Sequence, residues 1–211
     1  MDRVYANIIE YNQNMLKNGI DLPEWVNTRP ILSPSWRELG KILEGIDRET
    51  ACFEIGSGVG DILAILAGYG FKNIAGIEMD NRLSKLANQK LFDLYGIDGA
   101  VKTGKYPCTI MPKPELLIQL NCVYAETSES SSDYLKKLSD WQRYNGAPQT
   151  YLVELIDSSF TAPHEAYSDI VRVGYEDVQE AFSGYDVKRS STFVYPNNSS
   201  SKFIYTIRKR D

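Results

Sequence analysis

The chain has 211 residues, with 23 Lys and Arg, 28 Asp and Glu and one His, which gives a formal net charge of −5. Hydrophobic residues make up 43% of it and charged residues 24%, which is typical of a folded domain and excludes a disordered chain. The acidic balance argues against a broad nucleic-acid surface, and no apolar run approaches the roughly 20 residues that span a bilayer.

The N-terminus and the cysteines predict the cellular compartment. Residues 1–7 lead into polar sequence and do not form the apolar core of a signal peptide. Cys52, Cys108 and Cys122 are an odd number of widely spaced cysteines, which is typical of buried, reduced thiols. Because the chain has one histidine and no Cys-x-x-Cys motif, we expect no metal site. We therefore expect a cytoplasmic protein that contacts no membrane.

Two helices are predicted before residue 49. Residues 1 to about 28 carry apolar side chains at helical spacing, and a glycine and a proline end that pattern. A proline-punctuated stretch follows. Ser35 is then expected to cap a second helix over residues 36–43, because Glu38 stands at the reciprocal position of a capping box.

The clearest local pattern lies between residues 51 and 94. A short apolar strand over residues 51–55 leads into the tight loop Gly56-Ser57-Gly58-Val59-Gly60, here called the glycine loop. A buried helix over 61–69, a strand over 73–78 and a helix over 81–94 follow. Such a β-α-β-α unit predicts a parallel sheet covered by helices.

The alternation continues more faintly toward the C-terminus. Residues 124–132 are polar and rich in serine, which indicates a loop. The last two β-rich runs are joined by a long turn without a helix, which favours an antiparallel hairpin and one reversed strand. The remaining elements are strands over 99–103, 115–120, 150–156, 185–194 and 202–207, and helices over 133–144 and 176–182.

The spacing of the glycines limits the ligand that the glycine loop can bind. The dinucleotide fingerprint Gly-x-Gly-x-x-Gly needs a third glycine at position 61, where this chain has Asp61. A carboxylate at the start of that helix opposes a pyrophosphate, and no Gly-Lys-Ser/Thr of a Walker loop follows. A phosphate-free ligand that carries an amino group and a positive charge is compatible with Glu54 and Asp61.

Glu78 ends the second strand of this unit. A carboxylate there faces the carboxyl ends of the strands and can accept hydrogen bonds from both hydroxyls of a ribose. The residues therefore indicate an adenosine-like ligand with a cationic arm, a description that S-adenosylmethionine fits.

Residues 51–80, and more loosely 51–207, resemble the class I S-adenosylmethionine-dependent methyltransferases. The matching motifs are Phe53-Glu54-Ile55 with the glycine loop and Asp61, followed by Ile77-Glu78-Met79-Asp80. The resemblance implies an α/β, Rossmann-like fold, with a seven-stranded, mostly parallel sheet, a reversed last strand and helices on both faces. It also implies a helical cap on the substrate side over residues 1–48 and a cofactor-binding domain over 49–211.

The resemblance assigns roles to individual residues. The glycines would lie along the methionine arm with Glu54 near its amino group, Glu78 would hold the ribose, and Met79 would pack against adenine. Two positions depart from the family: Thr103 or a backbone carbonyl replaces an acidic residue near adenine, and Asn121 lacks the prolines that often follow it. The residues expected to bind the cofactor are Glu54, Gly56, Ser57, Gly58, Gly60, Glu78, Met79, Thr103 and Asn121.

Two residues are candidates for catalysis. His164, the single histidine, follows the fifth strand and is the natural proton acceptor near neutral pH, with Glu165 or Asp157 to orient it. The alternative is a solvent-exposed loop histidine. Asn121 either binds the acceptor or the cofactor, or caps the end of its strand.

These observations predict an enzyme that transfers a methyl group from S-adenosylmethionine to an O or N atom of a small-molecule metabolite. The acidic charge and the lack of a recognisable accessory domain favour this reading. A protein or RNA methyltransferase is one alternative, supported by Asn121 and the serine-rich loop. A non-catalytic S-adenosylmethionine-binding module is the other, because no complete catalytic motif is visible. The oligomeric state and the identity of the acceptor are left open.

Overall fold

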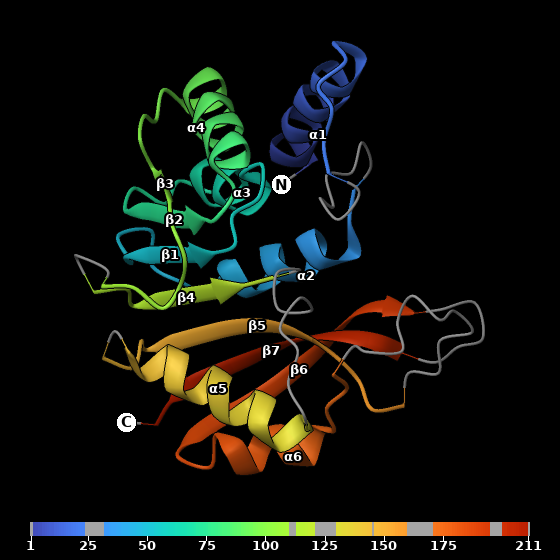
Figure 1. Cartoon of the computed structure of the whole chain (residues 1–211), viewed down its shortest axis with the longest axis vertical. Helices are drawn as coiled ribbons and strands as arrows, with labels where there is room; N and C mark the ends of the chain where they lie inside the picture. The colour runs from blue at the N-terminus through green and yellow to red at the C-terminus, as the bar shows by residue number, and fades with distance from the viewer. Residues whose placement is uncertain are drawn as a thin grey trace. The chain divides into compact units, whose positions relative to one another are not determined.

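The computed structural model describes residues 2–23, 32–109, 113–120, 130–144, 146–159, 171–194 and 200–210. The chain forms two compact units, Met1–Tyr106 and Pro107–Asp211 (Figure 1). The N-terminal helices therefore share a unit with the glycine loop, and the division into a cap over 1–48 and a domain over 49–211 stays a prediction. Among the described residues, no helix has both the length and the apolar character that a membrane span requires.

The sheet confirms the predicted fold class. It has seven strands in the order β3-β2-β1-β4-β5-β7-β6. Strand β7 runs antiparallel to both β5 and β6, whereas β1 pairs with β2, β2 with β3 and β4 with β5 in parallel. The bounds are β1 Cys52–Ile55, β2 Ile74–Glu78, β3 Val101–Thr103, β4 Leu116–Gln119, β5 Thr150–Ile156, β6 Tyr185–Val194 and β7 Ser200–Lys209.

Helices α3 (Asp61–Gly68) and α4 (Asn81–Tyr95) connect the strands of the first unit. The interior residues of α3, from Ile62 to Leu66, are all buried, as expected for a helix between parallel strands. Helix α4 begins at an N-cap, Asp80, whose carboxylate accepts hydrogen bonds from the N–H groups of Arg82 at 2.7 Å and Leu83 at 3.2 Å. These caps and apolar faces form the β-α-β-α unit that the sequence predicts.

Helices α1 (Asp2–Lys17) and α2 (Pro34–Leu43) belong to the same unit. Helix α1 lies beside α3 (Figure 1). It buries one face, and its Tyr5 hydroxyl donates to the carbonyl of Trp36 at 2.9 Å. The predicted cap of α2 was wrong. Ser33 is the N-cap and Pro34 the first helical residue, because proline lacks an N–H and its fixed φ suits that position. Ser35 lies inside the helix and is buried.

The second unit contains α5 (Ser131–Tyr144), α6 (Tyr175–Ala181) and the C-terminal hairpin. Every residue of β5 is buried, in keeping with its mostly apolar sequence, which Thr150 and Glu154 interrupt. Strands β6 and β7 pair from Tyr185↔Lys209 onward, so the predicted antiparallel hairpin is confirmed. Phe182, the C-cap residue of α6, packs its ring against Tyr151 of β5, with the ring centroids 6.2 Å apart.

Candidate functional site

The glycine loop joins the carboxyl end of β1 to α3 and is fastened to β2 by its backbone. The N–H groups of Gly56 and Ser57 both donate to the carbonyl of Ile77, at 2.9 and 3.0 Å. The N–H of Gly60 then donates to the carbonyl of Ser57 at 2.8 Å, which closes the turn before α3. The loop is therefore held in one conformation at the end of the parallel strands, where this class of sheet binds its ligands.

Glu78 connects the end of β2 to the glycine loop. Its side chain is 5% exposed, and its two carboxylate oxygens accept hydrogen bonds from Gly58 N–H at 2.8 Å and Asp80 N–H at 2.9 Å. A carboxylate has about four acceptor positions, so two remain for the hydroxyls of a ligand. Met79, the next residue, is 66% exposed and offers an apolar surface beside it.

Glu54 is a buried carboxylate with an unused acceptor. It is 2% exposed in β1, and its Oε2 atom has no hydrogen-bond partner among the described residues. Burial raises the pKa of Glu54 well above its usual 4.5, and the negative charges of Asp61 and Glu78 raise it further, against a smaller opposing effect of Ser57 and Lys90. A cationic donor beside Glu54 would satisfy this oxygen, so the site fits a ligand with an ammonium group.

Asp61, the first residue of α3, is paired within the protein. Its Oδ1 atom accepts hydrogen bonds from Lys90 Nζ at 2.5 Å and from Asn12 Nδ2 at 3.1 Å, and both donor residues are fully buried. From the sequence, a cationic ligand is compatible with both Glu54 and Asp61. The structure pairs the charge of Asp61 with Lys90, so Glu54 is the better placed of the two to receive a cation. An ionic residue at Lys90 within the apolar face of α4 was the one sequence signal of this pair.

Thr103 lies on β3 directly opposite Glu78 in the strand register. Its hydroxyl is within 2.6 Å of the Ser84 hydroxyl and donates to Asn81 Oδ1 at 3.2 Å, so it is engaged with the start of α4. The first unit thus contains eight of the nine residues predicted to bind the cofactor: Glu54, Gly56, Ser57, Gly58, Gly60, Glu78, Met79 and Thr103. The ninth, Asn121, and the catalytic candidate His164 lie outside the described residues.

Gly58 and Gly60 both have a positive φ, at 52° and 80°, but their surroundings differ. A Cβ on Gly60 would lie 2.9 Å from the Cβ and 3.1 Å from the Cα of Ala87, whereas a Cβ on Gly58 would meet nothing within 4 Å. We expect Gly60→Ala to lower the free energy of unfolding by about 2–4 kcal/mol, from backbone strain and overpacking together. Gly58→Ala carries only the backbone term of about 1–2 kcal/mol. Urea unfolding of both variants measures the difference, and equal losses would contradict this assignment.

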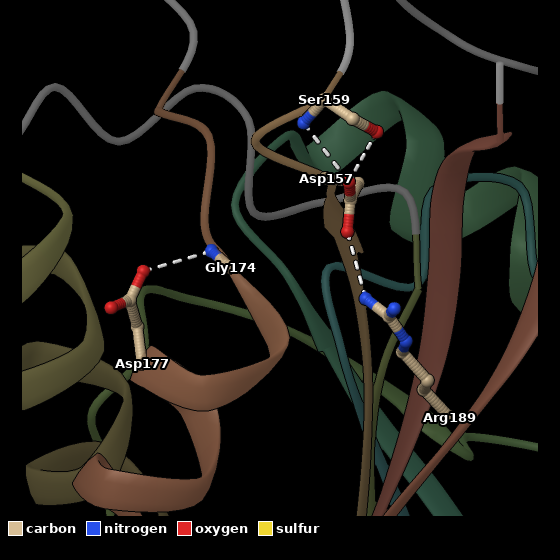
Figure 2. A network of polar contacts seen from close by, with 5 residues as sticks. All are labelled: Asp157, Ser159, Gly174, Asp177 and Arg189. Carbon is tan, nitrogen blue, oxygen red and sulfur yellow. Dashed lines mark hydrogen bonds and ion pairs between the residues drawn. The ribbon is translucent and has the colours of Figure 1, made fainter.

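A second polar network lies at the end of β5, in the other unit. Figure 2 shows Asp157 between Ser159 and Arg189: its Oδ1 accepts from the backbone N–H of Ser159 at 2.9 Å, and its Oδ2 accepts from Arg189 Nη1 at 2.8 Å. The guanidinium of Arg189 also lies 4.7 Å from the ring centroid of Tyr175 and 4.4 Å from that of Phe203. Asp157 therefore fixes the end of β5 to β6.

Replacing Asp157 with alanine is expected to destabilise the protein by about 1–3 kcal/mol, because it leaves the largely buried Arg189 ion pair and the Ser159 N–H without their acceptor. Asp186→Ala is the matched control, since its ion pair with Arg210 at 3.3 Å is exposed. The control should change stability by no more than about 0.5 kcal/mol. Thermal or urea unfolding separates the two, and a loss as small in Asp157→Ala as in the control would overturn the expectation.

Comparison with known proteins identifies the fold. No family model matches the chain, and no curated protein matches it in sequence. Magnesium protoporphyrin IX methyltransferase (ChlM) from Synechocystis PCC 6803 with bound SAM superposes with a TM-score of 0.62 at 14% identity, over 97% of this chain and 94% of that one. A structure from work on the conversion of a disulfide bond into a thioacetal group in echinomycin biosynthesis gives 0.60 at 14%, over 96% and 92%.

The small RNA methyltransferase HEN1 gives a TM-score of 0.61 at 15% identity, over 90% of this chain and 27% of that one. These similarities show that the chain has the Rossmann-like fold of the S-adenosylmethionine-dependent methyltransferases. Structures of ChlM contain the methyl donor or its product S-adenosylhomocysteine. The neighbours with this fold include proteins named for small-molecule and for RNA substrates.

Proposed function

We propose that the protein is an S-adenosylmethionine-dependent methyltransferase that transfers a methyl group to an O or N atom of a small molecule. The observation that carries the proposal is the buried Glu54 carboxylate of β1, next to the glycine loop and Glu78. One of its oxygens has no partner in the part of the chain that the structure describes. A buried carboxylate oxygen without a partner is costly, and an amino acid ammonium group is the complementary ligand. The fold shared with ChlM supports the same cofactor.

Each residue of this site in the first unit would bind a different part of the cofactor. Glu54 would accept hydrogen bonds from the methionine ammonium group, and the glycine loop would lie along the methionine arm. Glu78 would accept from the ribose hydroxyls on the positions that Gly58 and Asp80 leave free, and Met79 would cover the adenine. When bound, S-adenosylmethionine supplies an electrophilic methyl group on a sulfonium.

The chain's own part in the transfer is to bind the donor in a fixed position and to exclude water from it. A weakly polar environment around the acceptor favours the transfer, because the positive charge of the sulfonium is lost from the sulfur as the methyl group leaves it. His164 remains our candidate for the base that takes the acceptor's proton, and Asn121 for a hydrogen bond to the acceptor.

The small-molecule substrate class is supported by two observations. The net charge of −5 offers no basic field for a nucleic acid. The ChlM structure also matches almost the whole of this chain, and almost the whole of ChlM is matched in return. HEN1, named for RNA, makes an RNA acceptor the main competing outcome of the test.

The test has two stages. Calorimetry first measures binding of S-adenosylhomocysteine to the wild type and to Gly58→Arg, which adds a long cationic side chain at a loop position where a Cβ meets nothing within 4 Å. Purified protein is then incubated with methyl-labelled donor and a small-metabolite extract, bulk RNA or bulk protein. We expect binding by the wild type only, and label in the metabolite fraction. Label only in RNA or protein would contradict the substrate class, and absence of binding would contradict the cofactor.

A further inference from the structure

Val59, Gly60 and Asp61 run along one face of α4. Val59 packs in a cluster with Leu83, Gly60 lies against Ala87, and Asp61 pairs with Lys90. Positions 83, 87 and 90 are spaced by four and three residues, which places them on one face of a helix. The end of the glycine loop and the first residue of α3 therefore each contact one residue on this face of α4.

Helix α1 contacts Val59 of the glycine loop and Asp61 of α3. Met15 belongs to the cluster with Val59, and Asn12 donates to Asp61 Oδ1 at 3.1 Å. Lys90 is the charged member of this contact: it is fully buried, its ammonium donates to Asp61 at 2.5 Å, and it lies 5.7 Å from the ring centroid of Tyr11. A buried ammonium group is costly unless it has such partners, so the charge of Lys90 depends on its contacts with Asp61 and Tyr11.

We infer that Lys90 is a positioning residue of the cofactor site, which holds the start of α3 through Asp61 and keeps Glu54 able to bind a cation. This inference rests on the proposed function. It assigns to Lys90 an effect on ligand affinity that is electrostatic, and not merely a contribution to folding.

The charges that face Glu54 explain the effect. Asp61 on α3 and Glu78 on β2 are negative, Ser57 offers a hydroxyl, and Lys90 on α4 is the positive group among those that act on Glu54. Both neighbouring carboxylates favour the protonated form of Glu54, whereas Lys90 favours the ionised form, which attracts an ammonium group. Without Lys90, the uncompensated Asp61 would keep Glu54 neutral up to a higher pH.

The experiment measures S-adenosylhomocysteine affinity between pH 5.5 and 9 in three variants. In Lys90→Met we expect affinity at pH 7 to fall by about tenfold or more, with the pH at which binding is half-maximal moved upward, since one pKa unit corresponds to a factor of ten. In Asp61→Asn the charge on Lys90 is unopposed, and the midpoint should move downward. The double variant Asp61→Asn/Lys90→Met removes both charges and should return the midpoint toward that of the wild type.

The ligand's own titration is common to all variants and cancels in the comparison. Circular dichroism and thermal unfolding check that each variant folds. If Lys90→Met does not fold, the direction of the midpoint shift in Asp61→Asn tests the inference. Opposite shifts support the inference. Equal midpoints in folded variants, or a uniform loss of affinity at every pH, would overturn it and leave the proposed function standing. A wild type that binds no S-adenosylhomocysteine would instead refute the proposed function.

Discussion

Replacing Glu78 with alanine is expected to weaken S-adenosylhomocysteine binding by a factor of about 10²–10⁴. The substitution removes the acceptor of both Gly58 N–H and Asp80 N–H, which are bonded to the carboxylate at 2.8 and 2.9 Å. It also removes the proposed hydrogen bonds to the ribose hydroxyls. Two hydrogen bonds to a charged group contribute about 1.5–3 kcal/mol each, which gives the stated range.

Calorimetry or equilibrium dialysis measures this loss. Glu49→Ala serves as the control, because Glu49 is an exposed carboxylate that pairs with Lys72 on the surface of the same unit. The control should bind as the wild type does. Glu78→Gln adds a stricter comparison, because an amide keeps the size of the side chain but can accept on one atom only. An affinity within about threefold of the wild type in Glu78→Ala would show that the ribose is held elsewhere.

The first unit is the part of the fold that the sequence predicts best. Strand β1, α3, β2 and α4 each begin or end within one residue of their predicted bounds. Their apolar runs are interrupted by glycines and by Asp80, and these local signals are sufficient to set the ends of short elements. The same locality explains why Glu54, Glu78 and the glycine loop lie together at the ends of β1 and β2, since position within this unit is enough to place them there.

The ion pair of Lys90 and Asp61 is the part that the sequence could not supply. The two residues are 29 positions apart, and their pairing depends on how α4 packs against the start of α3. A pattern of hydropathy assigns a lysine to the solvent, and only tertiary packing buries it. The cap of α2 failed for a different reason: Ser33 and Ser35 are chemically equivalent, and the intervening Pro34 decides between them.

Replacing Glu54 with glutamine is expected to stabilise the ligand-free protein while weakening its binding of S-adenosylhomocysteine. Burial raises the pKa of Glu54 above the value near 4.5 that it has in the unfolded chain. The folded state therefore holds this proton more tightly, and the free energy of unfolding falls as the pH rises from about 4.5 through the raised pKa. Glutamine stays neutral and escapes this loss. The variant should gain stability at neutral pH, on the order of 0.5–2 kcal/mol, and gain nothing below about pH 4.5.

The affinity of Glu54→Gln for S-adenosylhomocysteine should fall by a factor of about 10–100, because the charge-assisted hydrogen bond to the ammonium group is lost. Urea unfolding between pH 4 and 8 and calorimetry at pH 7.5 measure the two effects. Glu154→Gln is the matched control for stability, since Glu154 is also fully buried in a strand but accepts a hydrogen bond from Thr192 at 2.6 Å, and its replacement should bring no gain.

The wild type carries one more signature of the same group. Where Glu54 is protonated in the free protein, binding of an ammonium group beside it must release that proton, and calorimetry in two buffers of different ionisation enthalpy counts it. Glu54→Gln should release fewer protons. A variant that gains stability and keeps its affinity would show that Glu54 is merely a strained core residue. Loss of affinity in the variant together with proton release in the wild type places the ammonium group at Glu54. The charge of Asp61 is paired with Lys90, and the acceptor positions of Glu78 that Gly58 and Asp80 leave free are assigned to the ribose hydroxyls.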